Sequence, residues 1–212
     1  MRSFFLLLLS AAALAAQPFG FGVKAGLPMN DFLSTARSGH ISYDSNTNRY
    51  IIGPSVELRL PFGLGIEFDA LYRHFGFSSS GADILGNSFD ARTTTGAWEF
   101  PLVAKYRFKG LPLIHPFVEA GVSWDHLSGV SQTLTSIVSN VTRTSSTSNP
   151  AELHKDTVTG FVMGGGIDFK LLVIHVVPEV RYTRWGSQHF LDLNGLLNSN
   201  QNQGEFLVGF KF

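Results

Sequence analysis

Three absences narrow the function of this 212-residue chain. It contains no cysteine, which excludes a disulfide, a thiolate metal site, a cysteine nucleophile and a lipid-modified N-terminal cysteine. Its 16 basic and 16 acidic residues cancel, so the chain has no basic field to attract nucleic acid. After residue 16 no continuous apolar run approaches the ~20 residues that a membrane-spanning helix needs.

The N-terminal apolar segment is short. Arg2 supplies a basic start, residues 4–9 form an apolar run, and residues 13–15 (Ala-Leu-Ala) fit a small-x-small cleavage site. We interpret residues 1–16 as a secretory signal peptide and residues 17–212 as one exported β-barrel domain. The alternative is an N-terminal membrane anchor, but the run is shorter than the ~20 residues of a spanning helix.

Alternation with a period of two predicts eight strands in the exported part. The pattern is clearest at the end of the chain, where Phe206, Val208, Phe210 and Phe212 point to one side and the intervening residues to the other. The expected strands cover residues 19–27, 50–60, 64–73, 97–108, 116–124, 160–170, 174–184 and 204–212.

The connections alternate in length along the chain. Three short connections cover residues 61–63, 109–115 and 171–173, and four long polar ones cover residues 28–49, 74–96, 125–159 and 185–203. Short and long connections therefore gather at opposite ends of the strands, each of which approaches the ~9–11 residues of a tilted spanning strand. The pattern predicts an all-β fold, an eight-stranded antiparallel up-and-down transmembrane β-barrel, with the long connections as solvated surface loops.

One face of each expected strand is apolar and the other carries the charges. Aromatic residues on the apolar face form two levels near the strand ends, as in membrane barrels. The outer level contains Tyr72, Trp98, Trp124 and Tyr182, and the inner level Phe19, Tyr106, Phe108, Phe169 and Phe212. We therefore expect the apolar face to meet lipid and the charged face to line the lumen.

The charges on the lumen face balance, which permits mutual pairing in a low-dielectric interior. Eight strands leave an interior just wide enough for side chains, so we expect a salt-bridged, largely closed lumen rather than a porin channel. The expected network contains Glu67, Asp69, Arg73, Glu99, Lys105, Arg107, Glu119, Glu179 and Arg181. The carboxylates Glu67, Asp69, Glu119 and Glu179 could alternatively form an acid–base cluster, but the presence of as many cations on the lumen face favours structural pairs.

Three segments resemble strands of the small eight-stranded bacterial outer-membrane β-barrel proteins, of the OmpA-type transmembrane barrel without a periplasmic domain. They are residues 98–108, 116–121 and 178–182. The terminal aromatic residues Phe206, Phe210 and Phe212 resemble the insertion signal read by the barrel-assembly machinery in that family. The resemblance implies an integral protein of a Gram-negative-type outer membrane, with outer-membrane lipid and that machinery as partners.

One short motif raises the possibility of catalysis. His126-Leu127-Ser128 resembles the motif of outer-membrane lipid A deacylases, which implies a histidine that activates the serine and a carboxylate, here Asp125 or Glu152, that orients the histidine. The asparagine that follows the serine in that family is Gly129 here. Serine is abundant in this segment, so we favour the interpretation that His126 and Ser128 are ordinary rim residues.

The remaining candidates are weaker. His126 and His154 flank one long connection, but a metal site needs three or four converging ligands, so we expect a polar pair and no metal or cofactor. The glycines of residues 164–166 lie mid-strand with no helix following, which favours close packing over a phosphate loop. We therefore expect a non-enzymatic outer-membrane barrel with a structural or surface-interaction role. The alternatives are a lipid A-modifying enzyme and a narrow channel.

Overall fold

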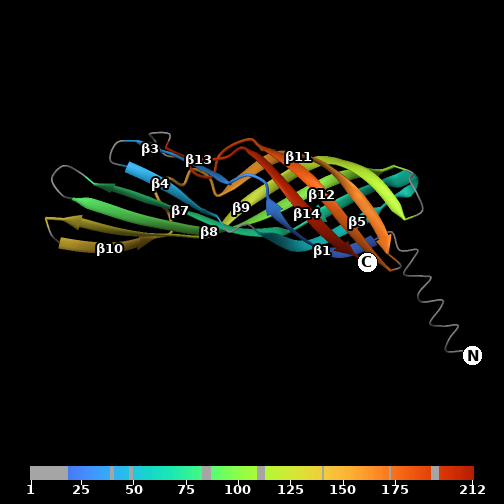
Figure 1. The fold of residues 1–212 in the computed structure, drawn as a ribbon, viewed down its shortest axis with the longest axis horizontal. Coiled ribbons are helices and arrows are strands. Elements are labelled where there is room, and N and C mark those ends of the chain that lie inside the picture. Colours follow the sequence, from blue (N-terminus) through green and yellow to red (C-terminus); the bar gives the residue numbers. More distant parts are fainter. Residues whose placement is uncertain are drawn as a thin grey trace, which may run out of the picture.

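The computed structural model describes residues 19–38, 41–47, 50–82, 87–108, 113–139, 141–171, 173–191 and 196–212. The expected signal peptide, residues 1–16, lies outside this described part. Figure 1 shows an elongated molecule made of strands that run obliquely along its long axis. Within the described residues, no helix has both the length and the apolar character needed to cross a bilayer.

The strands are β1 (Phe19–Pro28), β2 (Leu33–Thr35), β3 (Arg37–Ser38), β4 (Ile41–Thr47), β5 (Ile51–Arg59), β6 (Leu64–Asp69), β7 (Leu71–Ala82), β8 (Ser88–Arg107), β9 (Ile114–Val138), β10 (Val141–Thr147), β11 (Thr157–Leu171), β12 (Ile174–Trp185), β13 (Leu197–Ser199) and β14 (Asn202–Lys211). A 3-10 turn, η1 (Pro61–Gly63), joins β5 to β6. Apart from the short β2–β13 pair, all these strands belong to one sheet.

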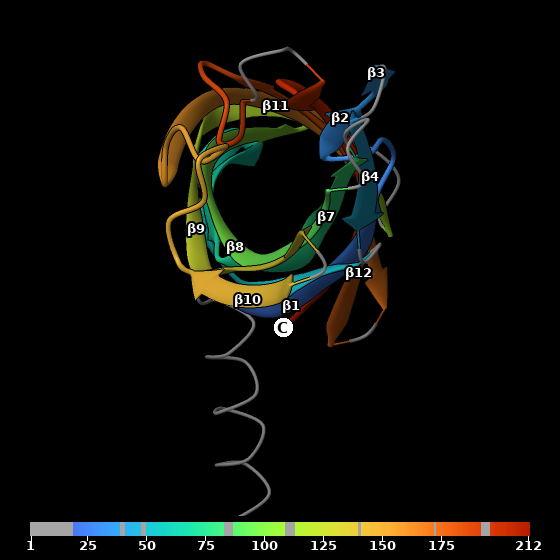
Figure 2. The same cartoon turned by 90° about the vertical axis from the view of Figure 1, so that its left-hand side faces the viewer.

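The sheet closes into an antiparallel barrel of eight strands, which confirms the expected fold class. β6 and β7 together form the third span, and the ring then runs through β8, β9, β11, β12 and β14 back to β1 and β5. Closure is visible at Ala25 of β1, which pairs with Val208 of β14 on one side and with Ile52 of β5 on the other. Figure 2 shows this ring from one end of the barrel.

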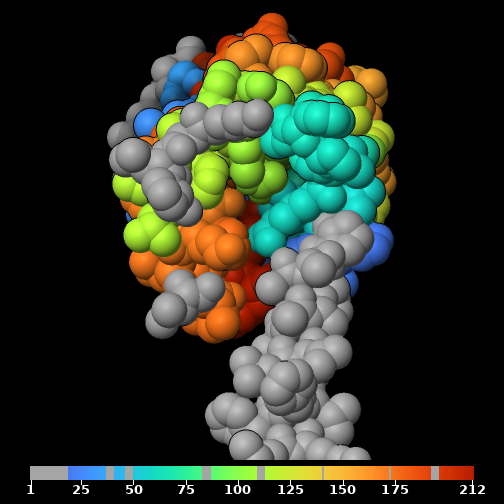
Figure 3. Space-filling view, turned by 90° about the vertical axis from the view of Figure 1, so that its right-hand side faces the viewer, coloured from blue at the N-terminus to red at the C-terminus, as the bar shows by residue number. Residues whose placement is uncertain are grey.

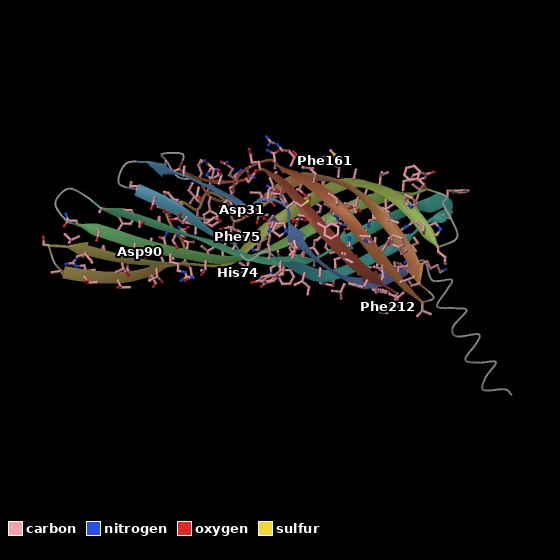
Figure 4. The ribbon with its side chains drawn as sticks, viewed as in Figure 1. Asp31, His74, Phe75, Asp90, Phe161 and Phe212 are labelled. Atoms are coloured by element: carbon pink, nitrogen blue, oxygen red, sulfur yellow. The ribbon has the colours of Figure 1, made fainter. Side chains whose placement is uncertain are left out.

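The barrel is apolar outside and charged inside, as the alternation predicts. Phe161 and Met163 on β11 are 47% and 46% exposed, whereas Lys24 and Glu67 are completely buried in the lumen. In Figure 4, Phe161 and Phe212 lie on the outside of the barrel. A water-soluble barrel would show the reverse arrangement, because exposed apolar surface is costly in water.

The short connections gather at one end of the barrel, which we call the turn end. Figure 3 looks onto this end, where η1 joins β5 to β6 and where β8 ends and β9 begins. In the β5–β6 turn both Phe62 and Gly63 have positive φ angles, 66° and 84°. A side chain at Gly63 would approach the Arg107 carbonyl oxygen to 2.4 Å, so this tight connection requires glycine.

The expectation of long, irregular loops at the opposite end is wrong for two of them. β7 continues to Ala82, β8 already begins at Ser88, and β9 extends to Val138, where a hairpin leads into β10. These segments contain many Thr and Val residues, which favour extended backbone, but they lack the alternation of an amphipathic strand. Together β10, β9, β8, β7, β4 and β3 continue beyond the barrel as an open sheet, which we call the projecting sheet (Figure 1).

The two other long connections also contain order that the sequence did not indicate. Residues 28–49 contribute β2, which pairs with β13 from residues 185–203. Their apolar side chains pack against the inner face of the projecting sheet and form an apolar cap over this end of the barrel. The cap contains Phe32, Leu33, Tyr43, Phe75, Phe77, Ala97, Leu127, Phe190 and Leu197.

Candidate functional site

The lumen contains three groups of ion pairs, stacked along the barrel. The middle cluster consists of Lys24, Glu67, Asp69, Lys105, Glu119, Glu179 and Arg181, all buried. Arg181 contacts four carboxylates, with distances of 3.0 Å to Glu67, 2.7 Å to Asp69, 2.6 Å to Glu119 and 3.0 Å to Glu179. Charged groups this deeply buried are tolerated only when they are paired and hydrogen-bonded.

Two lysines complete the middle cluster. Lys24 Nζ lies 3.0 Å from Asp69 and 2.6 Å from Glu179, and it also contacts Glu67. Lys105 Nζ lies 2.8 Å from Glu67 and 3.2 Å from Glu179. Carboxylate oxygens of Glu67, Asp69 and Glu179 converge closely enough to hold a metal ion. Lys24 contacts all three of them, however, so an ammonium group already supplies the positive charge that a metal ion would bring.

The turn-end cluster joins the middle cluster through Lys211. Its Nζ lies 2.9 Å from Glu57 and also contacts Glu67. Arg107 contacts Glu57 and places its Nε 3.3 Å from Asp168. His175 Nδ1 lies 2.6 Å from the other oxygen of Asp168. Lys211 is on β14 and Glu57 on β5, so this pair spans β1, the strand that closes the barrel.

The sheet-end cluster is centred on Arg73. Its Nη2 lies 2.7 Å from Asp125, and its Nη1 lies 3.3 Å from Glu99 and 3.2 Å from Glu205. His189 approaches Asp125 to 3.0 Å through Nε2, while its Nδ1 lies 2.7 Å from the Lys155 carbonyl oxygen. Here three carboxylates share one guanidinium and one imidazole, and one oxygen each of Glu99, Asp125 and Glu205 is buried without a hydrogen-bond partner.

The apolar cap covers the sheet-end cluster. The Phe32 ring lies 4.7 Å from the Arg73 guanidinium and 4.0 Å from the Phe75 ring. Phe190 packs edge-on against Phe77, with ring centroids 5.4 Å apart. The cation–π contact and the aromatic packing place apolar side chains directly above the last ion pairs of the lumen.

The structure thus places the nine expected network residues together in the lumen, in these three clusters. Five further residues join them from the charged strand faces: Lys24, Glu57, Asp168, Glu205 and Lys211. Asp125, His175 and His189 are the members that sequence reasoning missed. Continuing the alternation from Glu119 through Ser123 would have assigned Asp125 to the lumen. No periodicity precedes His189, which enters from a long connection.

The glycines of residues 164–166 make room for the network. A side chain at Gly164 would approach the Val180 carbonyl oxygen to 2.6 Å and the Glu119 Oε1 to 3.0 Å. A side chain at Gly166 would lie 2.8 Å from the Phe117 ring. Since Gly164 pairs with both Arg181 and Glu119, its missing side chain lets these two groups meet.

The motif His126-Leu127-Ser128 lies on β9 near the rim. His126 is exposed, and its Nδ1 lies 2.8 Å from the Thr157 hydroxyl. Asp125 points to the opposite face of the strand, where it pairs with Arg73 and His189. Glu152 accepts a hydrogen bond of 3.2 Å from Gln132. Neither carboxylate that the motif suggested is therefore hydrogen-bonded to His126 in the described part of the chain.

The two histidines flanking this connection also have separate partners. The backbone N–H of His154 donates to the His189 carbonyl oxygen at 2.7 Å, whereas the His126 side chain contacts Thr157. Among the residues that the structure describes, the side chains of His126 and His154 make no direct contact.

The projecting sheet ends in an open edge. β10 pairs with β9 on one side only, and all seven residues of β10 are exposed. At the tip of the β9–β10 hairpin, Val138 and Val141 expose apolar side chains. Arg143 is the single charged residue of the strand. An open edge without proline or repeated charge is a template for pairing with another extended chain.

Comparison with known proteins identifies the family to which the barrel belongs. Residues 15–186 match the sequence profile of a family described as the outer membrane protein beta-barrel domain. The chain belongs to this family. It is therefore an integral outer-membrane protein in contact with lipid, as expected from the sequence. Because such barrels have short periplasmic turns and longer extracellular connections, we expect the turn end to face the periplasm and the projecting sheet to face the exterior.

The chain is similar to several solved structures, of which OprG supports the fold. OprG from Pseudomonas aeruginosa is 13% identical over 92% of this chain and 94% of its own, with a TM-score of 0.52. Neisserial surface protein A is also 13% identical, over 92% and 96% of the two chains, with a TM-score of 0.42. Ail of Yersinia pestis is 9% identical over 91% and 98%, with a TM-score of 0.39. No curated protein matches the chain.

Proposed function

We propose that this outer-membrane barrel is a non-enzymatic surface-interaction protein that presents its projecting sheet to an extended polypeptide outside the cell. The observation that carries the proposal is the open edge at β10, whose seven residues are exposed and paired on one side only. Strand addition supplies affinity through main-chain hydrogen bonds, and alternate side chains supply specificity. The apolar tip at Val138 and Val141 adds surface that a partner would bury.

The test uses a random-peptide phage library panned on the refolded protein in detergent. We expect the enriched peptides to bind the native protein. We expect this binding to be lost in a variant in which an Asn-Gly turn replaces residues 132–147. Proline variants at the adjacent positions Arg143 and Thr144 give a finer test. Neighbouring residues direct their N–H groups to opposite sides of a strand, so one variant should block the open edge and the other should disturb the β9–β10 hairpin. Equal peptide enrichment on the protein without residues 132–147 would overturn the proposal.

A lipid A-modifying activity has a separate test. The separation of Asp125 from His126 supports the non-enzymatic proposal, because a hydrolytic serine needs a histidine that is itself oriented by a partner. We expect lipid A from cells producing the native protein and the Ser128→Ala variant to give the same mass spectrum. Loss of a modified lipid A species in the variant would instead establish an enzyme.

We further propose that Phe206, Phe210 and Phe212 form the signal that the barrel-assembly machinery reads. All three lie on the lipid-facing side of the last strand and are exposed, so they are available to a partner before the barrel meets lipid. We expect Phe212→Ala to lower the fraction of protein inserted in the outer membrane. Phe62→Ala, at an exposed aromatic in the β5–β6 turn, is the matched control.

A further inference from the structure

Arg184 interrupts the apolar outer surface of the barrel. On β12 it follows Val180 and Tyr182 on the same outward face, and its side chain is exposed. Tyr182 belongs to the outer aromatic level, where interfacial tyrosines sit at the depth of the lipid headgroups. Arg184 lies one outward position further from the bilayer centre, so its guanidinium is placed beside the headgroups of the outer leaflet.

Among the described residues, Arg184 has no acidic partner. Its Nη1 donates a hydrogen bond of 2.7 Å to Asn202 Oδ1, which is neutral. The Tyr182 hydroxyl donates to the same oxygen, also at 2.7 Å. In the described ranges of the chain no carboxylate lies within ion-pair distance of Arg184, whereas Arg181 on the opposite face contacts four. A guanidinium has five N–H donors, so most of them remain available.

The surroundings fix the position of these donors. The backbone oxygen of Asn202 accepts a hydrogen bond of 2.7 Å from Asn30, whose own side-chain oxygen accepts one of 2.6 Å from the Gly204 N–H. Asn202 is thereby held between β12 and the end of β1. The Arg184 side chain, anchored on Asn202, is therefore presented in a defined place at the rim.

Below Arg184 the surface is apolar. Phe161 is its register partner on β11, and Phe206 on β14 lies beside Val180. Phe161 is exposed on the outside of the barrel (Figure 4). Between Tyr182 and Met29 the outward position is Gly204, which leaves a space without a side chain. A cation with free donors beside an apolar surface complements a molecule with an anionic head and acyl chains.

We propose that Arg184, together with the side-chain NH2 group of Asn202, binds the phosphate group of an outer-leaflet lipid whose acyl chains lie along Phe161, Val180 and Phe206, while the Tyr182 hydroxyl holds the Asn202 side chain in place. A guanidinium pairs with phosphate through two parallel hydrogen bonds, and such bonds are stronger than those between neutral groups. This site lies in the membrane interface and is independent of the interaction proposed for the projecting sheet.

Native mass spectrometry of the refolded full-length protein in detergent tests the site. The probe is bisphosphorylated lipid A, and the comparison is the same lipid after removal of both phosphates. We expect the native protein to bind the phosphorylated form about tenfold more tightly, as the loss of one hydrogen bond to a charged group implies. Arg184→Gln should abolish the preference and Arg184→Lys should retain part of it. Arg92→Gln, at an exposed arginine of β8, should leave it unchanged.

Equal binding of the two lipids by the native protein would overturn the proposal without any variant. An undiminished preference in Arg184→Gln would overturn the assignment to this residue. Heat-modifiable migration on a denaturing gel verifies that each variant is folded before it is compared. Since no peptide is present in these measurements, their outcome is separate from that of the phage experiment.

Discussion

Among single residues, Arg181 has the widest role in the lumen because its guanidinium contacts four buried carboxylates. Replacing it with methionine keeps much of the side-chain volume but leaves those carboxylates short of one positive charge. We expect Arg181→Met to lower the free energy of unfolding by about 3–5 kcal/mol, which is the cost of removing one partner of a buried ion pair. Urea titration of the protein in lipid vesicles, followed by tryptophan fluorescence, measures this change.

The matched control for Arg181→Met is Arg92→Met, because Arg92 is exposed on β8. An exposed position away from special features changes stability by no more than about 0.5 kcal/mol. If both variants unfold at the same urea concentration as the native protein, the middle cluster does not stabilise the barrel.

Gly164 gives a second prediction at this scale. A valine there would bring Cβ to 2.6 Å from the Val180 carbonyl oxygen and 3.0 Å from Glu119. Because backbone cannot move aside as a flexible side chain can, we expect Gly164→Val to refold in markedly lower yield. Gly209→Ala is the control, since its nearest neighbour would be an ordinary 3.6 Å away. The fraction of heat-modifiable protein on an unboiled gel reports the yield, and equal yields would refute the steric explanation.

The sequence indicates which residues face the lumen but not which residues pair there. Alternation alone assigns Glu67, Lys105 and Arg181 to one face, because the period of two is fixed by strand geometry. Their meeting depends on the stagger of strands around the ring, which no local pattern contains. Asp125 is an example. The sequence pattern places it in a loop beside His126, but in the structure its side chain lies in the lumen and pairs with Arg73.

For whole elements, the sequence finds the part of each strand that lies in lipid and misses the part that does not. β9 is expected over residues 116–124 and runs over Ile114–Val138. Within the membrane one face must be apolar and the other polar, so the alternation is strong. In the projecting sheet Ser and Thr occupy both faces of β10, and the pattern is absent although the backbone is still extended.

Because the projecting sheet lies outside the membrane part of the strands, we expect the barrel to fold without the β9–β10 hairpin. We expect the variant in which an Asn-Gly turn replaces residues 132–147 to fold and to retain heat-modifiable migration, since these residues pair with each other and with the projecting part of β8. A variant without β14 is the contrasting control, because the ring then lacks the strand between β12 and β1. Identical migration of boiled and unboiled hairpin variant would contradict the prediction.

For the molecule as a whole, the three clusters and the apolar cap predict a barrel that does not conduct. The lumen is occupied by paired side chains along its length, and Phe32 lies over Arg73 at the extracellular side. We expect planar-bilayer recordings of the refolded native protein to show no discrete conductance steps. Regular steps that persist across preparations would establish the narrow channel instead.

Because β1 pairs with β14, the barrel can close only when the last strand is available. Strands near the two ends of the chain meet at this seam, where Lys24 and Lys211 contact carboxylates of strands on either side. During export β1 emerges before β14. The edge of β1 that pairs with β14 therefore remains uncovered until all the other strands have been exported. Such distant pairing is slow, and an uncovered edge invites pairing with the wrong chain. The free edge of β1 therefore stays open to mispairing until β14 covers it.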